Sequence, residues 1–196
     1  MEAIVFATNN KHKIEEIQAI LGNYIRIIPL SETGCTEEIP ETSLTIEGNA
    51  VQKAMYVFEK YHVGCFADDT GLEVEALGGR PGVKSARYAG PGHDFDANVT
   101  KLLKELQGQL SRRARFKTVI SLVTRDHEMI FEGIINGIIT TERRGKGGFG
   151  YDPVFIPDGY EQTFAEMPAE LKNAISHRAI ATRKLVSFLQ EQYNKK

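Results

Sequence analysis

Strand and helix patterns alternate through the first seventy residues of this chain, and that order constrains the fold more than any other feature. Apolar runs of strand length occur at 3–7, 24–28 and 63–67. Between them lie two segments, 14–21 and 50–58, whose apolar residues recur at helical spacing. A β-α-β-α-β order favours a largely parallel sheet with helices against its faces. We therefore expect an α/β fold.

The remaining residues predict a long loop, two helices and a hairpin. Glycine and proline are frequent at 76–92, which favours a loop. A helix is expected at 99–106, and the β-rich runs at 114–123 and 129–135 are typical of an antiparallel hairpin. A last helix is expected to start near Ser176. The 196 residues contain no linker or repeat, so we expect one domain, long enough for two lobes around a cleft.

Charge and cysteine content exclude several classes of protein. The formal net charge of -2 gives no general attraction to nucleic acid or anionic membranes, so an anion site needs a local concentration of positive charge. The two cysteines, Cys35 and Cys65, lack metal-ligand spacing and suggest a reducing compartment without disulfides. No apolar run reaches transmembrane length and no segment resembles a signal peptide, so a cytoplasmic location is the default expectation.

Two adjacent acids, Asp68 and Asp69, follow the apolar run at 63–67. In open α/β sheets, ligands bind beyond the carboxyl ends of the strands, so acids placed there would face a crevice. Adjacent carboxylates repel, and a metal ion, a basic group or water must compensate them. One interpretation is a cation site, to which the loop acid Glu41 could add an oxygen ligand, since Mg²⁺ needs few protein carboxylates. The other interpretation is a solvated turn.

Two helices begin with basic residues where acids are usual. The first opens with Lys11, His12 and Lys13, although the partial positive charge of a helix start disfavours cations. Each lysine there costs roughly a few tenths of a kcal/mol unless an anion binds. Phosphate is the natural candidate, because helix N–H groups beside an Asn-rich loop make an anion cradle. Solvated lysines are the alternative. The last helix repeats the pattern with His177 and Arg178.

A glycine-rich segment at 145–150 precedes a Tyr-Asp-Pro sequence. It lacks the G-x-x-x-x-G-K-[ST] pattern of a P-loop. We interpret it as a loop that brings Phe149 and backbone groups close to a planar ligand, because glycine permits a near approach. Phe149 as an ordinary core residue is the alternative.

Taken together, these motifs resemble the inosine triphosphate pyrophosphatase family, and their order and spacing are similar to its bacterial dITP/XTP pyrophosphatase branch. The resemblance covers nearly the whole chain. The matching blocks are Thr8–Lys13 with Glu16, Glu41–Thr42, Asn49–Ala50 with Lys53–Ala54, Asp68–Leu72, Pro81–Tyr88, Phe149–Pro153 and Ser176–Arg178. The chain departs from the pattern at Gly48, where no acid is available as a metal ligand, and at Lys84, where an aromatic residue is often found.

The resemblance implies a mixed α/β fold with an elongated central sheet flanked by helices, two lobes with the active site between them, and usually a homodimer. The implied reaction is Mg²⁺-dependent hydrolysis of ITP, dITP and XTP to the monophosphate and pyrophosphate, which cleans the nucleotide pool. The implied partner is a purine nucleoside triphosphate, with no nucleic acid and no membrane.

The resemblance also implies a role for particular residues. Asp69 is the implied proton acceptor and a metal ligand, Glu41 is the second metal ligand, and Thr70 touches the substrate. The residues implied to hold the triphosphate are Thr8, Asn9, Asn10, Lys11, His12 and Lys13. Those implied to surround the base and sugar are Phe149, Gly150, Tyr151, Asp152, Lys172, His177 and Arg178.

Base selection and two rival functions complete the expectations. Inosine and xanthine carry a 6-oxo acceptor where adenine has an amino donor, so donors aimed at that position would discriminate against ATP. His177, Arg178 and backbone N–H groups near Phe149 could supply such donors. One rival is a metal-dependent phosphomonoesterase, which would release orthophosphate. The other is a non-catalytic nucleotide-binding module, which would bind ITP without turnover.

Overall fold

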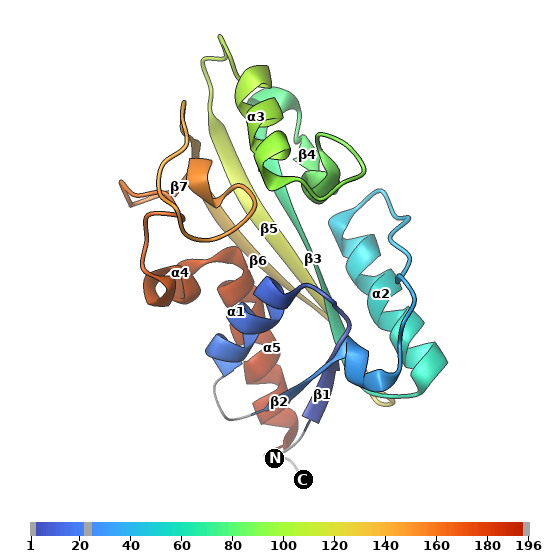
Figure 1. Cartoon of the computed structure of the whole chain (residues 1–196). Coiled ribbons are helices and arrows are strands. Elements are labelled where there is room, and N and C mark those ends of the chain that lie inside the picture. The colour runs from blue at the N-terminus through green and yellow to red at the C-terminus, as the bar shows by residue number, and fades with distance from the viewer. Residues whose placement is uncertain (1–2, 22–24, 194–196) are drawn as a thin grey trace. The chain divides into compact units, whose positions relative to one another are not determined.

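The computed structural model describes residues 3–21 and 25–193, and Figure 1 shows the whole chain. The chain divides into two compact units. Unit 1 comprises 1–69, 118–133 and 177–196, and unit 2 comprises 70–117 and 134–176. None of the described helices is long and apolar enough to cross a membrane.

Helices and strands are distributed over both units. Unit 1 holds β1 (Ala3–Phe6), α1 (Lys11–Leu21), β2 (Arg26–Pro29), α2 (Ile46–Tyr61) and α5 (His177–Tyr193). Unit 2 holds β4 (Pro81–Gly82), α3 (Phe95–Glu105), β7 (Phe155–Pro157) and α4 (Ala169–Ile175). Three strands contribute residues to both units: β3 (Cys65–Val74), β5 (Arg113–Val123) and β6 (Glu128–Ile139). Short 3₁₀ turns occupy Leu30–Thr33, Glu75–Leu77, Ser85–Arg87 and Asp152–Val154.

The described strands form a mixed sheet. Seven strands take part, in the order β2-β1-β3-β5-β6-β7, with β4 paired to β3. β1 runs parallel to β2 and β3, whereas β4 and β7 run antiparallel to their partners β3 and β6. A tight turn joins the neighbouring strands β5 and β6, and in it the N–H of Thr124 donates to the carbonyl of His127 over 2.8 Å. The predicted α/β class and the hairpin are therefore confirmed, and the parallel arrangement holds for the first three strands.

In unit 1, helices cover both faces of the sheet. α1 and α5 lie side by side on one face (Figure 1). There Ile17 and Leu185 pack in one cluster with Phe66. α2 covers the other face, where Ala54 belongs to a second cluster with Ala67. Neighbouring residues of β3 belong to different clusters because side chains alternate between the two faces of a strand.

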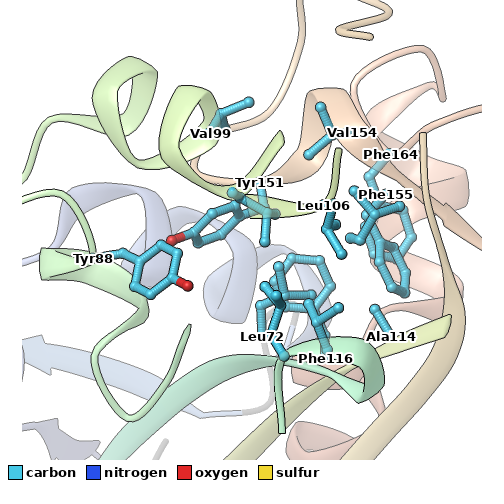
Figure 2. Packing of buried hydrophobic residues seen from close by; sticks show 14 of the residues in the cluster. Leu72, Tyr88, Val99, Leu106, Ala114, Phe116, Tyr151, Val154, Phe155 and Phe164 are labelled. Carbon is cyan, nitrogen blue, oxygen red and sulfur yellow. The ribbon is translucent and has the colours of Figure 1, made fainter. Parts of the chain in front are cut away.

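Unit 2 has an aromatic core of its own, shown in Figure 2. Phe116 of β5 meets the ring of Phe155 edge-on, with the centroids 4.7 Å apart. Phe155 also packs against Phe164 with a centroid distance of 5.3 Å. Burial of one such side chain contributes about 2–3 kcal/mol, so these three rings are a main source of the stability of unit 2.

The third strand is longer than the sequence predicts. It does not end at Ala67 but continues through Asp68 and Asp69 to Val74. Asp and Gly have low strand propensity, but pairing with β5 and, at Leu72 and Glu73, with β4 overrides it. The sequence patterns also do not predict the short elements α4, β4 and β7. The second strand, expected at 24–28, begins at Arg26, and Tyr24 lies outside the described residues.

The buried stripe predicted for α2 is confirmed only in part. Its predicted members are Ala50, Val51, Ala54, Met55 and Phe58; Ala50 and Ala54 are buried, whereas Val51, Met55 and Phe58 are half-buried. The residues buried in the structure are Ile46, Asn49, Ala50, Lys53, Ala54 and Val57. Two polar side chains thus occupy places in the stripe where a hydrophobic pattern would put apolar ones.

Candidate active site

Asp68 and Asp69 lie inside β3 and point to opposite faces of the sheet. Phe66, two residues before Asp68, packs in the cluster under α1 and α5, and Ala67, two residues before Asp69, packs under α2. The alternation of a strand therefore directs Asp68 toward α1 and α5, and Asp69 toward α2. Both residues are buried, so the predicted strand end and the alternative of a solvated turn are both wrong. Opposite directions also relieve the repulsion expected of neighbouring carboxylates.

Asp68 is surrounded by basic side chains from two helices. Lys13 of α1 places its Nζ 2.9 Å from Oδ1 of Asp68, and Arg178 of α5 places its Nε 3.5 Å from Oδ2. The guanidinium of Arg178 also forms an ion pair with Glu16. Burial alone would raise the pKa of Asp68, but Lys13, Arg178 and then Lys53 together hold that pKa below its ordinary value. Asp68 is therefore an anion that holds two cations in place.

The two basic helix starts meet protein groups in this structure. At the start of α1, the N–H of Lys13 donates to Oδ1 of Asn10 over 3.3 Å, and the N–H of Asn10 donates to Oγ1 of Thr8 over 3.2 Å. Asn10 thus acts as a helix cap. Its side chain accepts a hydrogen bond from one of the helix N–H groups that were predicted to bind phosphate. The side chains of three further predicted residues, Asn9, Lys11 and His12, are exposed. At the start of α5, His177 and Arg178 are buried instead of solvated.

Asp69 has a different set of neighbours on the α2 face. Lys53 places its Nζ 3.6 Å from Oδ1 of Asp69 and 2.5 Å from Oε1 of Glu41. Asn49 donates from Nδ2 to Oδ2 of Asp69 over 3.4 Å. Burial raises the pKa of Asp69, and the negative charges of Glu41 and Asp68 add to this effect, which Lys53 and Lys13 oppose. Desolvation would lower the pKa of Lys53, but the surrounding carboxylates raise it.

The carboxylates of Glu41 and Asp69 fit a divalent cation in their chemistry. Both approach the same ammonium group of Lys53, so they converge on a position that already attracts positive charge. Two carboxylates suit Mg²⁺, which takes oxygen ligands and completes its shell with water and substrate phosphates. Within 3–21 and 25–193, no group of three or more His, Cys, Asp or Glu side chains has the arrangement of a metal site. A cation between Glu41 and Asp69 would have to take the place of Lys53.

A third cluster of predicted site residues lies in unit 2. Oδ2 of Asp152 accepts hydrogen bonds from the backbone N–H of Phe149 over 2.8 Å and from Nζ of Lys172 over 2.7 Å. The ammonium of Lys172 also lies 4.9 Å from the centre of the Phe149 ring. Gly148 has a φ of +71°, and a Cβ there would lie 2.2 Å from Oδ2 of Asp152. The glycine is therefore required for the loop to close on Asp152.

The other predicted residues of this region have defined places. Tyr151 is buried in the core of unit 2 (Figure 2), and its hydroxyl donates to the carbonyl of Ser85 over 2.9 Å. Gly150 has a φ of +63°, which favours glycine. Thr70 follows Asp69 in β3 and is half-buried. Because the Tyr151 side chain is engaged in the core, only its backbone is available to a ligand.

Three residues of the matching blocks contact the predicted site residues, although no role was predicted for them: Glu16, Asn49 and Lys53. Each belongs to a helix, where the sequence pattern does not distinguish it from an ordinary polar residue. Asn49 and Lys53 do carry one recognisable signal: they are four residues apart and each precedes an alanine, Ala50 and Ala54, that is fully buried. Polar side chains next to small buried residues at this spacing indicate a helix face that meets other polar groups.

Known proteins resemble this chain over almost its whole length. A family model described as the Ham1 family matches residues 4–188. A dITP/XTP pyrophosphatase of Porphyromonas gingivalis is 55% identical over 190 residues, which cover 96% of this chain and 98% of that protein. One from Flavobacterium johnsoniae is 53% identical, with 95% of this chain and 97% of that protein covered. The solved structure of the Staphylococcus aureus Ham1 protein has a TM-score of 0.90 at 38% identity, covering 97% of this chain and 100% of that one.

Proposed function

This chain belongs to the Ham1 family, and from that premise we propose that it hydrolyses non-standard purine nucleoside triphosphates to the monophosphate and pyrophosphate. The substrates are XTP, dITP and ITP. The observation that carries the proposal is the full-length similarity to curated relatives that are dITP/XTP pyrophosphatases. The whole chain works as one domain in this proposal, in the cytoplasm, and removes these nucleotides from the pool.

Asp69 is the proposed proton acceptor. A general base is most effective when its pKa lies near the working pH, and burial raises the pKa of this carboxyl. Asp69 takes a proton from a water molecule as the oxygen attacks the α-phosphorus. The ammonium of Lys53, 3.6 Å from Oδ1 of Asp69, opposes this effect because its positive charge stabilises the carboxylate form.

Glu41 and Asp69 are the residues proposed to hold Mg²⁺. When bound, Mg²⁺ supplies positive charge that neutralises the triphosphate and polarises the α-phosphorus. The convergence of both carboxylates on Lys53 supports this pairing, because it shows that their charges are directed to one place. Asp68 points to the opposite face of the sheet and is proposed to act through Lys13 instead.

The start of α1 is proposed to hold the triphosphate. Lys13 would contribute its ammonium, and Asp68 fixes the position of that ammonium. The exposed residues Asn9, Lys11 and His12 would add donors and positive charge at the same helix start. Thr8 and Asn10 shape the turn through their hydrogen bond and complete the predicted phosphate loop. Thr70 is proposed to contact the substrate beside Asp69.

The purine and sugar are assigned to the cluster in unit 2 and to the start of α5. Phe149 offers an aromatic ring, and the hydrogen bond from its N–H to Asp152 fixes the loop that carries it. Lys172 is a donor already held by Asp152. Donors of this kind, with backbone groups of Gly150 and Tyr151, would match the 6-oxo group of hypoxanthine and xanthine. His177 and Arg178 complete the predicted set.

The test is a panel of nucleoside triphosphates incubated with and without Mg²⁺, with pyrophosphate and orthophosphate measured separately. We expect pyrophosphate from XTP, dITP and ITP, a strong requirement for Mg²⁺, and much slower release from ATP. Orthophosphate as the main product would indicate the phosphomonoesterase, and tight ITP binding without turnover would indicate the binding module. Sedimentation of the same preparation tests the homodimer that we also propose.

A further inference from the structure

The loop that carries Glu41 is tied to α2 on both sides of that residue. On the N-terminal side, Oε1 of Glu37 accepts hydrogen bonds from three side chains of α2. The donors are the hydroxyl of Tyr56, Nζ of Lys60 and the hydroxyl of Tyr61, at 3.1, 2.5 and 2.9 Å. These contacts fix where the loop begins to cross the helix.

On the C-terminal side, two residues of the loop bind the first turns of α2. The N–H of Thr42 donates to Oε1 of Gln52 over 2.9 Å, and Nε2 of Gln52 donates back to Oγ1 of Thr42 over 2.9 Å. The N–H of Ser43 donates to Oδ1 of Asn49 over 2.9 Å. Asn49 and Gln52 are three residues apart and therefore lie on the same face of the helix.

Asn49 uses both ends of its amide. Oδ1 accepts from Ser43 and Nδ2 donates to Oδ2 of Asp69. The orientation of the amide is determined by its partners, because a backbone N–H can only donate and a carboxylate can only accept. The residue is 4% exposed, so water does not compete freely for either hydrogen bond.

Lys53 also reaches both the Glu41 loop and Asp69, but in a different way. Its ammonium attracts both carboxylates as a positive charge and is the group that a divalent cation would replace. The amide of Asn49 is neutral and directional, and a cation between Glu41 and Asp69 does not take its place. The link through Asn49 can therefore persist when the charges around Asp69 change.

We propose that Asn49 is a positioning residue for the hydrolysis: its amide fixes the direction of the Asp69 carboxylate and the place of the Glu41 loop relative to it. This inference rests on the proposed function, in which Asp69 takes a proton from water. Asn49 does not touch the substrate. Its effect is expected on the chemical step, because the angle between the carboxylate and the water decides how readily the proton moves.

Asn49→Asp tests the inference with little change in size. The aspartate can still accept from Ser43, but an oxygen replaces the donor that faced Asp69. We expect kcat for XTP to fall roughly tenfold to a hundredfold, as for a small misplacement of a catalytic group. KM should stay within about twofold, because the residues proposed to hold the triphosphate are unchanged. Should this variant not fold, Asn49→Ala removes both hydrogen bonds without adding a charge and carries the same expectation.

Asn98 of α3 provides a matched control. It is also buried, it accepts from the N–H of Ala89 over 2.7 Å, and it donates to the carbonyl of Ala86 over 3.0 Å. Asn98→Asp therefore makes the same exchange far in sequence from any proposed catalytic carboxylate, and should lower the melting temperature while leaving kcat within about twofold.

The outcomes test the positioning role of Asn49 and the proposed hydrolysis separately. An unchanged kcat in Asn49→Asp and Asn49→Ala overturns the positioning role, and so does an equal loss of kcat in Asn98→Asp. If the wild-type protein releases no pyrophosphate from XTP, dITP or ITP, the proposed function fails before the variants are compared.

Discussion

Single residues of this chain act through the charges that surround them. Asp68 and Asp69 are neighbours in sequence and have the same side chain, yet their pKa values move in opposite directions. Three basic groups lower the pKa of Asp68 against the effect of burial, whereas burial dominates at Asp69. The same residue type is thus prepared for two tasks: a permanent anion that holds Lys13 and Arg178, and a base that can accept a proton.

The first prediction concerns Asp69→Asn. Turnover of XTP should fall by roughly a hundredfold or more, because the variant loses the base and a proposed metal ligand. Stability at neutral pH should be equal or higher, since a raised pKa means that the folded protein disfavours the charged carboxylate. Pyrophosphate release and a thermal melt measure the two effects. Turnover near that of the wild type would remove Asp69 from the mechanism.

A second prediction separates the two roles of Lys13. Lys13→Met should raise KM for XTP and cost roughly 1–3 kcal/mol of unfolding free energy, because buried Asp68 loses one partner. The double variant Lys13→Met with Asp68→Asn should recover stability while KM stays raised. Urea unfolding and steady-state kinetics measure these quantities. An unchanged KM in both variants would show that Lys13 does not contact the triphosphate.

For single residues, the sequence predicts which side chains are functionally unusual better than it predicts which side chains they contact. Lys13 and Arg178 stand out because they break the rule for helix starts, and the structure brings both to Asp68. The sequence interpretation assigned Lys13 to the triphosphate and Arg178 to the base and sugar, and it could not identify a carboxylate of β3 as their partner. Lys13 and Asp68 are far apart in the sequence, and only the fold brings them into contact. A local sequence pattern therefore cannot predict this pair.

Among the elements, α2 illustrates how a helix can organise a loop. The carboxylate of Glu37 binds three donors of this helix, and through them the preceding loop is held against it. Hydrogen bonds from Lys60 and then Tyr61 lower the pKa of Glu37 below its ordinary value. The loop that carries Glu41 is therefore stabilised by a charge that depends on pH.

The third prediction follows from that charge. A lowered carboxyl pKa stabilises the folded state above the ordinary value of 4.5, and the contribution is lost as pH falls below it. Glu37→Gln should therefore lower the urea midpoint at neutral pH and reduce the difference between neutral pH and about pH 3. Glu59→Gln, which removes an exposed acid from the same helix, is the control. Equal pH dependence in wild type and Glu37→Gln would contradict the role of Glu37.

Elements with a clear period are predictable, and those shaped by pairing are not. α1 and α3 follow from apolar residues at helical spacing, and the hairpin of β5 and β6 follows from two β-rich runs with a polar turn. The start of α5 at His177 agrees with the helix expected near Ser176. The extension of β3 through Asp68 and Asp69 does not follow from composition, because pairing with neighbouring strands supports residues of low strand propensity. α4 has 7 residues and is too short to establish a period.

For the molecule as a whole, chain order and spatial grouping differ. Unit 1 draws on three separate segments and unit 2 on two, and β3 passes from one to the other directly after Asp69. Neither unit is a continuous piece of sequence. A modest net charge of -2 also hides strong local contrasts, because cations and anions of the candidate site form ion pairs within each unit, Lys13 with Asp68 in unit 1 and Lys172 with Asp152 in unit 2.

The long separation of β3 and α5 along the chain has a consequence for biosynthesis. During translation, β3 and Asp68 leave the ribosome long before α5, which brings Arg178 to Asp68 and covers that face of the sheet with Leu185 and Leu189. A nascent chain therefore holds the Asp68 carboxylate without its full set of counter-charges until α5 has been synthesised. Nucleotide hydrolysis should begin only once α5 has left the ribosome.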